Sequence, residues 1–103
     1  MQIQIYANGL EVGDAFREFV EQRIGATLAH HAERLTRVEV HFKDLNAGKG
    51  GIDKRCLLEA RPRGMDPIAV EHDAKELRDS VIQASEKLQR ALTNRFGRRE
   101  AAG

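Results

Sequence analysis

The stretch Val38-Glu39-Val40-His41-Phe42-Lys43 decides the fold, because apolar and polar side chains alternate strictly along it. A repeat of two residues predicts a β-strand with one apolar and one polar face. The three apolar side chains are therefore expected in the core, and the three polar ones on an open face of the sheet. A sheet that is wet on one face needs helices on the other face only.

Three further segments are predicted as strands. Residues 2–6 alternate in the same way, with both isoleucines pointing inward, and residues 55–61 place one cysteine, one leucine and one alanine on a common face. A turn at 62–67 holds two prolines and a glycine, and a short strand follows at about 68–71. The glycine-rich residues 46–51 predict a hairpin loop between the second and third strands.

Two segments show helical spacing. A helix that begins at Gly13 or Asp14 is expected to continue to about residue 31 or 32, with a shared apolar face formed by Phe16, Phe19, Val20 and Ile24. A second helix is expected over about 74–96, with Gly97 as its C-cap. Its apolar stripe consists of Leu77, Val81, Ala84, Leu88, Ala91 and Leu92.

The predicted order is β-α-β-β-β-α, which places the chain in the α+β class. We expect a four-stranded mixed sheet with both helices packed on one face. A chain of 103 residues suits one domain. We assign residues 1–97 to that domain and residues 98–103 to a short C-terminal tail.

The sequence predicts a binding protein and no enzyme. It contains no nucleophile elbow, P-loop, zinc-protease motif or dinucleotide fingerprint. Its four histidines and the inward-facing Cys56 lack the spacing of metal ligands, so no metal, cofactor or small-molecule substrate is expected. No apolar run approaches the roughly 20 residues of a membrane span, and residues 1–5 lack the basic region and apolar stretch expected of a signal peptide. We therefore expect no membrane association and a cytoplasmic location.

The net charge of +1 conceals a basic C-terminal end, where residues 86–99 hold one acid and five bases. Lys87, Arg90 and Asn94 share one helix face, and Arg98 and Arg99 follow. Such a surface suits phosphate, because Arg pairs with phosphate oxygens in a bidentate way. Cations also gather at helix C-termini because the macrodipole favours them there. The charge pattern alone leaves both interpretations open.

Several segments, taken in order, carry a family resemblance. These are the opening Met1-Gln2-Ile3-Gln4-Ile5, residues 10–12 and 16–21, residues 32–40, and Lys87-Leu88-Gln89-Arg90-Ala91-Leu92 with the arginines that follow. Together they resemble the ribosome hibernation-promoting factor / ribosome-associated inhibitor A family. Its members are also called ribosomal subunit interface or sigma-54 modulation proteins.

The resemblance implies a fold like that of a double-stranded-RNA-binding domain with an extra first strand. It implies binding to rRNA and proteins of the small ribosomal subunit, in the channel of messenger and transfer RNA. It also implies silencing of translation under stress or in stationary phase, as in the short form of the family. The matching basic positions are Arg23, Lys87, Arg90, Arg95, Arg98 and Arg99, to which we add Arg34 and Arg37.

One segment departs from the family pattern. Residues 72–81 lack the tyrosine that the family usually has there, and they carry extra charges. Strong RNA binders usually have a basic excess, whereas this chain is near neutral. The alternative is therefore a protein–protein interaction module of the same fold that no longer binds ribosomes.

Overall fold

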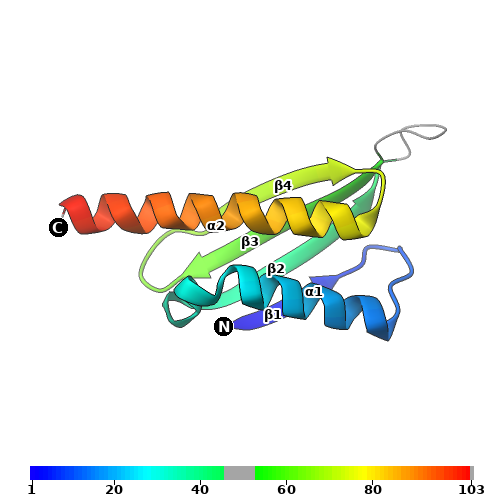
Figure 1. The fold of residues 1–103 in the computed structure, drawn as a ribbon, viewed down its shortest axis with the longest axis horizontal. Helices are drawn as coiled ribbons and strands as arrows, with labels where there is room; N and C mark the ends of the chain where they lie inside the picture. Colours follow the sequence, from blue (N-terminus) through cyan, green and yellow to red (C-terminus); the bar gives the residue numbers. More distant parts are fainter. Residues whose placement is uncertain (46–52, 103) are drawn as a thin grey trace.

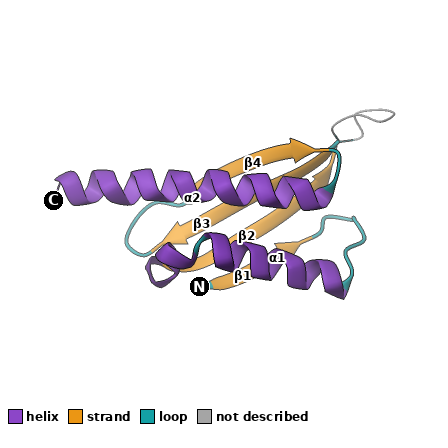
Figure 2. Cartoon of the chain, in the orientation of Figure 1, coloured by secondary structure: helices purple, strands orange, loops and turns teal. Residues whose placement is uncertain are grey.

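The computed structural model describes residues 1–45 and 53–102, with the backbone alone described for 99–102. The hairpin loop predicted at 46–51 lies outside the described residues. Figure 2 shows the strands, the two α-helices and a short 3₁₀ segment in the predicted β-α-β-β-β-α order. The elements are β1 (Gln2–Tyr6), α1 (Asp14–Thr27), η1 (Ala29–Arg34), β2 (Leu35–Asp44), β3 (Lys54–Pro62), β4 (Ile68–Ala74) and α2 (Leu77–Ala102).

The four strands form one mixed sheet in the order β1-β2-β3-β4. The edge strand β1 pairs with β2 in parallel, and the other neighbours are antiparallel. Both helices lie side by side on one face of this sheet, and the far face has no helix on it (Figure 1). The predicted fold class and layer arrangement are therefore confirmed.

The alternation in β2 builds the centre of the core. Val38, Val40 and Phe42 are fully buried beneath the helices, as their spacing predicted. Leu35 is also buried although it is out of phase with these residues, because the register with β3 shifts between Leu35 and Arg37. The other elements contribute Val20, Ile24, Leu28, Cys56, Leu58, Ala60, Val81, Ala84, Leu88, Leu92 and Phe96.

The end of the second helix differs from the prediction. Helix α2 continues through Gly97 to Ala102, so Gly97 is no C-cap and most of the expected 98–103 tail is helical. Gly97 has no positive φ, so it does not adopt the left-handed conformation of a C-cap glycine. The start also differs, because β4 extends to Ala74 and α2 begins at Leu77.

The first helix is shorter than expected. It ends at Thr27, and η1 takes the place of the predicted last turn. The His31 N–H donates to the Leu28 carbonyl at 2.9 Å, a bond across three residues that tightens the chain. Leu28 and Leu35 are both fully buried, so this tight segment leads the chain from α1 directly into β2.

We expect Gly25→Ala to raise the free energy of unfolding by roughly 0.5–1 kcal/mol, because glycine weakens a helix interior. Gly25 lies within α1, and an added Cβ there meets no atom within 4 Å. Urea denaturation measures the change. Gly64→Ala is the matched control: Gly64 has a φ of +68°, so the same substitution should destabilise the protein. Destabilisation by Gly25→Ala would contradict the helix assignment at that position.

Candidate nucleic-acid interface

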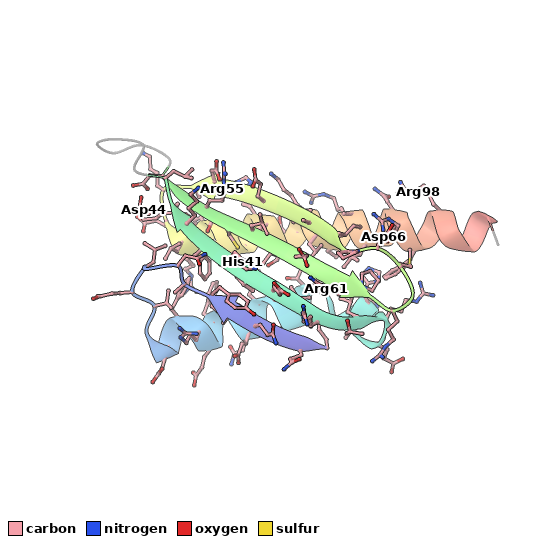
Figure 3. The ribbon with its side chains drawn as sticks, turned by 180° about the vertical axis from the view of Figure 1, so that it is seen from behind. His41, Asp44, Arg55, Arg61, Asp66 and Arg98 are labelled. Atoms are coloured by element: carbon pink, nitrogen blue, oxygen red, sulfur yellow. The ribbon has the colours of Figure 1, made fainter. Side chains whose placement is uncertain are left out.

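The arginines on the open sheet face are paired with carboxylates. Figure 3 shows this face, with Arg55 and Arg61 pointing away from the helices. Arg55 Nε donates to Asp73 Oδ1 at 2.8 Å and its Nη2 donates to Oδ2 at 3.1 Å, while Arg61 Nη2 lies 2.7 Å from Glu59 Oε1. The hydrogen bonds from Arg55 lower the pKa of the Asp73 carboxyl. The positive charge of this face is therefore largely neutralised within the sheet.

Arg37 belongs to this paired sheet surface. Its Nη2 lies 2.8 Å from Glu39 Oε2, and the His41 Nε2 donates to the other oxygen of Glu39 at 3.1 Å. The pKa of the Glu39 carboxyl is lowered, first by the hydrogen bond with His41 and then by Arg37 and Arg61. The structure thus places Arg37 on the face opposite to the helices, apart from the other predicted site residues.

The predicted cations of α2 have no such partners. Among the described residues, no carboxylate lies within ion-pair distance of Lys87, Arg90, Arg95 or Arg98, although Lys87 is close enough to Asp73 to help lower the pKa of that carboxyl. Lys87 Nζ donates to the Glu71 carbonyl at 3.1 Å, and Arg95 Nη1 donates to the Asp66 carbonyl at 3.3 Å. These two bonds join α2 to β4 and to the preceding turn. Arg90 and Arg98 are exposed. The side chain of Arg99 lies outside the described part of the chain.

Helix α1 contributes Arg23, and α2 adds a residue that the sequence analysis did not select. Arg78 lies in the first turn of α2, and its Cζ is 4.0 Å from the ring centroid of Phe19 on α1. Arg23 approaches the same ring at 6.0 Å. In the sequence Arg78 is next to Asp79, so its charge looks compensated locally. Only the packing of α1 against α2 reveals that it lies beside Arg23.

Arg34 is the last residue of η1, and its side chain packs against α2. Its Cζ is 4.7 Å from the ring centroid of Phe96, and the His31 ring packs against the same phenyl group at 5.2 Å. His31 Nε2 is also 3.0 Å from the Thr93 hydroxyl. Burial lowers the pKa of His31, and the nearby His30 and Arg34 lower it further. Arg34 is thus held beside the C-terminal turns of α2, although it lies far from them in the sequence.

Cys56 is buried in the core. Burial raises the pKa of its thiol to about 12, so the thiolate needed for nucleophilic chemistry does not form near neutral pH. No group of three potential metal-ligating side chains occurs in residues 1–45 and 53–102. Within the same ranges, no helix is long and apolar enough to cross a bilayer.

Comparison with known proteins identifies the family. The model of the family described as Sigma 54 modulation protein / S30EA ribosomal protein matches residues 3–100. The chain belongs to this family. It is also 28% identical over 94 residues to Ribosome-binding factor PSRP1, chloroplastic, from Spinacia oleracea. That match covers 89% of this chain but 31% of the spinach protein, so the chain spans about a third of that relative's length.

Two solved structures share the fold. A ribosomal subunit interface protein from Coxiella burnetii superposes with a TM-score of 0.74 at 17% identity, covering 94% of this chain and 99% of the other. The N-terminal domain of Thermus thermophilus Protein Y gives a TM-score of 0.72 at 23% identity, with coverages of 93% and 99%. The double-layered arrangement of a mixed sheet and two helices is therefore shared over nearly the whole length of these chains.

The lowered pKa of His31 predicts a pH dependence of stability. Unfolding restores the ordinary value of 6.5, so in weakly acidic solution the unfolded chain binds a proton that the folded chain resists. The His31 contribution to stability is therefore lost as the pH falls through about 6.5. We expect His31→Gln to reduce the loss of unfolding free energy between about pH 7.5 and pH 5.5. Chemical denaturation at both pH values measures it.

His30→Gln is the comparison variant. His30 is exposed and lowers the pKa of His31 less than burial does, so this substitution should reduce the pH dependence less than His31→Gln. Identical pH dependence in the His31 variant and the wild type would show that the contacts of His31 with Phe96 and Thr93 do not affect its protonation.

Proposed function

We propose that this protein binds the small ribosomal subunit through its helical layer and silences translation by occupying the channel of messenger and transfer RNA. The single observation that carries the proposal is that the two faces differ in whether their cations are paired with carboxylates. Arginines of the sheet face are paired with carboxylates, as in Arg55–Asp73 at 2.8 Å, whereas the cations of α2 lack carboxylate partners among the described residues.

Unpaired cations suit the RNA backbone for a thermodynamic reason. A cation that binds a phosphate releases condensed counterions, whereas one already paired with a carboxylate must first give up that partner. Phosphate contacts also position a protein on folded RNA without reading its sequence. The proposed contact set is Arg23, Lys87, Arg90, Arg95 and Arg98, together with Arg34, which lies beside the C-terminal turns of α2, and Arg99, which the family resemblance implies. Neither Arg34 nor Arg99 is included on the ground of its pairing. Arg37 is left out because it lies on the opposite face and is paired with Glu39.

The names of two relatives agree with ribosome binding. The spinach relative is named a ribosome-binding factor, and the structural neighbour from Coxiella burnetii is named a ribosomal subunit interface protein. In this proposal the protein acts in the cytoplasm under stress or in stationary phase, and its activity is steric occupancy without a catalytic step. The partners are the rRNA and proteins of the small subunit.

The triple variant Lys87→Glu, Arg90→Glu, Arg95→Glu is expected to abolish co-sedimentation with ribosomes from the host. Each replacement sets a carboxylate against phosphate instead of a cation, and all three side chains belong to the proposed contact set. The wild-type protein should sediment with the small subunit or the intact ribosome at low salt, and should dissociate steeply as salt rises. Far-UV circular dichroism checks that the variant is still folded.

A matched pair of single variants tests whether binding depends on where a cation lies or only on the net charge of the protein. Arg90→Glu and Lys43→Glu change the charge equally at exposed positions, but Lys43 lies on the sheet face. We expect Arg90→Glu to weaken binding and Lys43→Glu to leave it nearly unchanged. Equal weakening by both would mean that only overall charge matters. Binding that does not respond to salt would favour the alternative, a protein–protein interaction module of the same fold.

A further inference from the structure

The groove between α1 and α2 gathers two guanidinium groups around one aromatic ring. The Cζ atoms of Arg78 and Arg23 lie 4.0 Å and 6.0 Å from the centroid of Phe19. The two helices run side by side here (Figure 1), and the groove is also lined by Gln22, Ala26 and Thr27. Among the described residues, no carboxylate lies within ion-pair distance of either guanidinium. Two like charges therefore share one surface hollow without a counter-charge.

The ring beneath these arginines is firmly anchored. Phe19 packs against Phe16 with their ring centroids 5.9 Å apart, and Phe16 packs against Phe42 at 5.7 Å. Phe42 is fully buried at the centre of β2. The Phe19 ring is thus the outermost member of an aromatic row that begins in the core. This row gives Arg78 a fixed surface on which to stack.

Stacking leaves the hydrogen-bonding groups of Arg78 available. A guanidinium on an aromatic ring uses its flat face, whereas its N–H groups point outward in the plane of the group. That planar fork matches two oxygens of one phosphate. Arg23 beside it adds a second positive charge, and an anion bound between the two relieves their mutual repulsion.

Three arginines of the sheet are held in a different way. Arg37, Arg55 and Arg61 on the sheet each lie within 3 Å of a carboxylate oxygen, at 2.8, 2.8 and 2.7 Å. The groove arginines are instead held by an aromatic ring, which positions a cation without neutralising it. The groove lies in the same helical layer as Lys87 and Arg90, so an RNA backbone that follows α2 is the anion it fits best.

We propose that the α1–α2 groove holds a phosphodiester group of ribosomal RNA, with Arg78 as the main donor and Arg23 as the second. This inference rests on the proposed ribosome binding. It adds to the contact set a site near the N-terminal end of α2, far along the helix from Arg98. The segment 72–81, which departs from the family pattern, would then supply a contact of its own.

The test compares Arg78→Met with Lys43→Met. Methionine keeps contact with the Phe19 ring through its sulfur but removes the charge. Lys43→Met removes the same charge from the sheet face. Ribosome affinity is measured over a salt series, and thermal unfolding of each variant is measured alongside. We expect Arg78→Met to weaken binding about tenfold and to reduce the slope of log affinity against log salt by roughly 0.7–0.9.

The conservative variant Arg78→Lys should keep most of the salt slope, because it keeps the charge, while it loses affinity with the bidentate fork. Wild-type protein that fails to bind ribosomes would overturn the proposed function, and the groove assignment with it. Wild-type binding that Arg78→Met leaves unchanged in affinity and slope would overturn the groove assignment alone. Weaker binding by a less stable Arg78→Met with an unchanged slope would also overturn it, because Arg78 would then act only through packing.

Discussion

The separation of the sheet into a dry face and a charged face is the constraint on which the rest of the molecule depends. Along β2, Val38 and Val40 are fully buried under the helices, while Glu39 between them forms ion pairs on the open side. A shift of the strand by one residue would exchange the two sets. Core packing and charge placement are therefore fixed by the same register, and the carboxylates of the sheet form ion pairs with the arginines of the sheet.

The helical layer is electrostatically different, because the carboxylates of the sheet are already paired within the sheet. Several of its cations are positioned by uncharged partners: backbone carbonyls hold Lys87 and Arg95, and a phenyl ring holds Arg78. Such contacts restrict a side chain without cancelling its charge. A chain with a net charge of only +1 thereby keeps one basic surface, so overall charge is a poor guide to what this domain binds.

The length of α2 gives that surface its reach. The helix has 26 residues, and at a rise of about 1.5 Å per residue it spans most of the 50 Å long axis of the molecule. Its C-terminal turns extend beyond the edge of the sheet (Figure 1). Phe96 is only 5% exposed there because Arg34 and His31 pack against it from η1. The short 3₁₀ segment is therefore a support for the end of α2 as well as a connection.

The sequence by itself determined the order of elements, the mixed sheet and most of the core, because the spacing of apolar residues is a local property that sets which side of a strand or helix is buried. Only the tertiary structure decided where α2 ends and which cations keep their charge unpaired. The sequence predicts that the helix ends at Gly97, yet Gly97 lies within a continuous helix. Arg78 gains its partner Phe19 from a different helix, and Arg55 its partner Asp73 from a different strand. Charges interact through space over several ångströms, so their pairing follows from the packing of distant segments and not from the residues beside them in the chain.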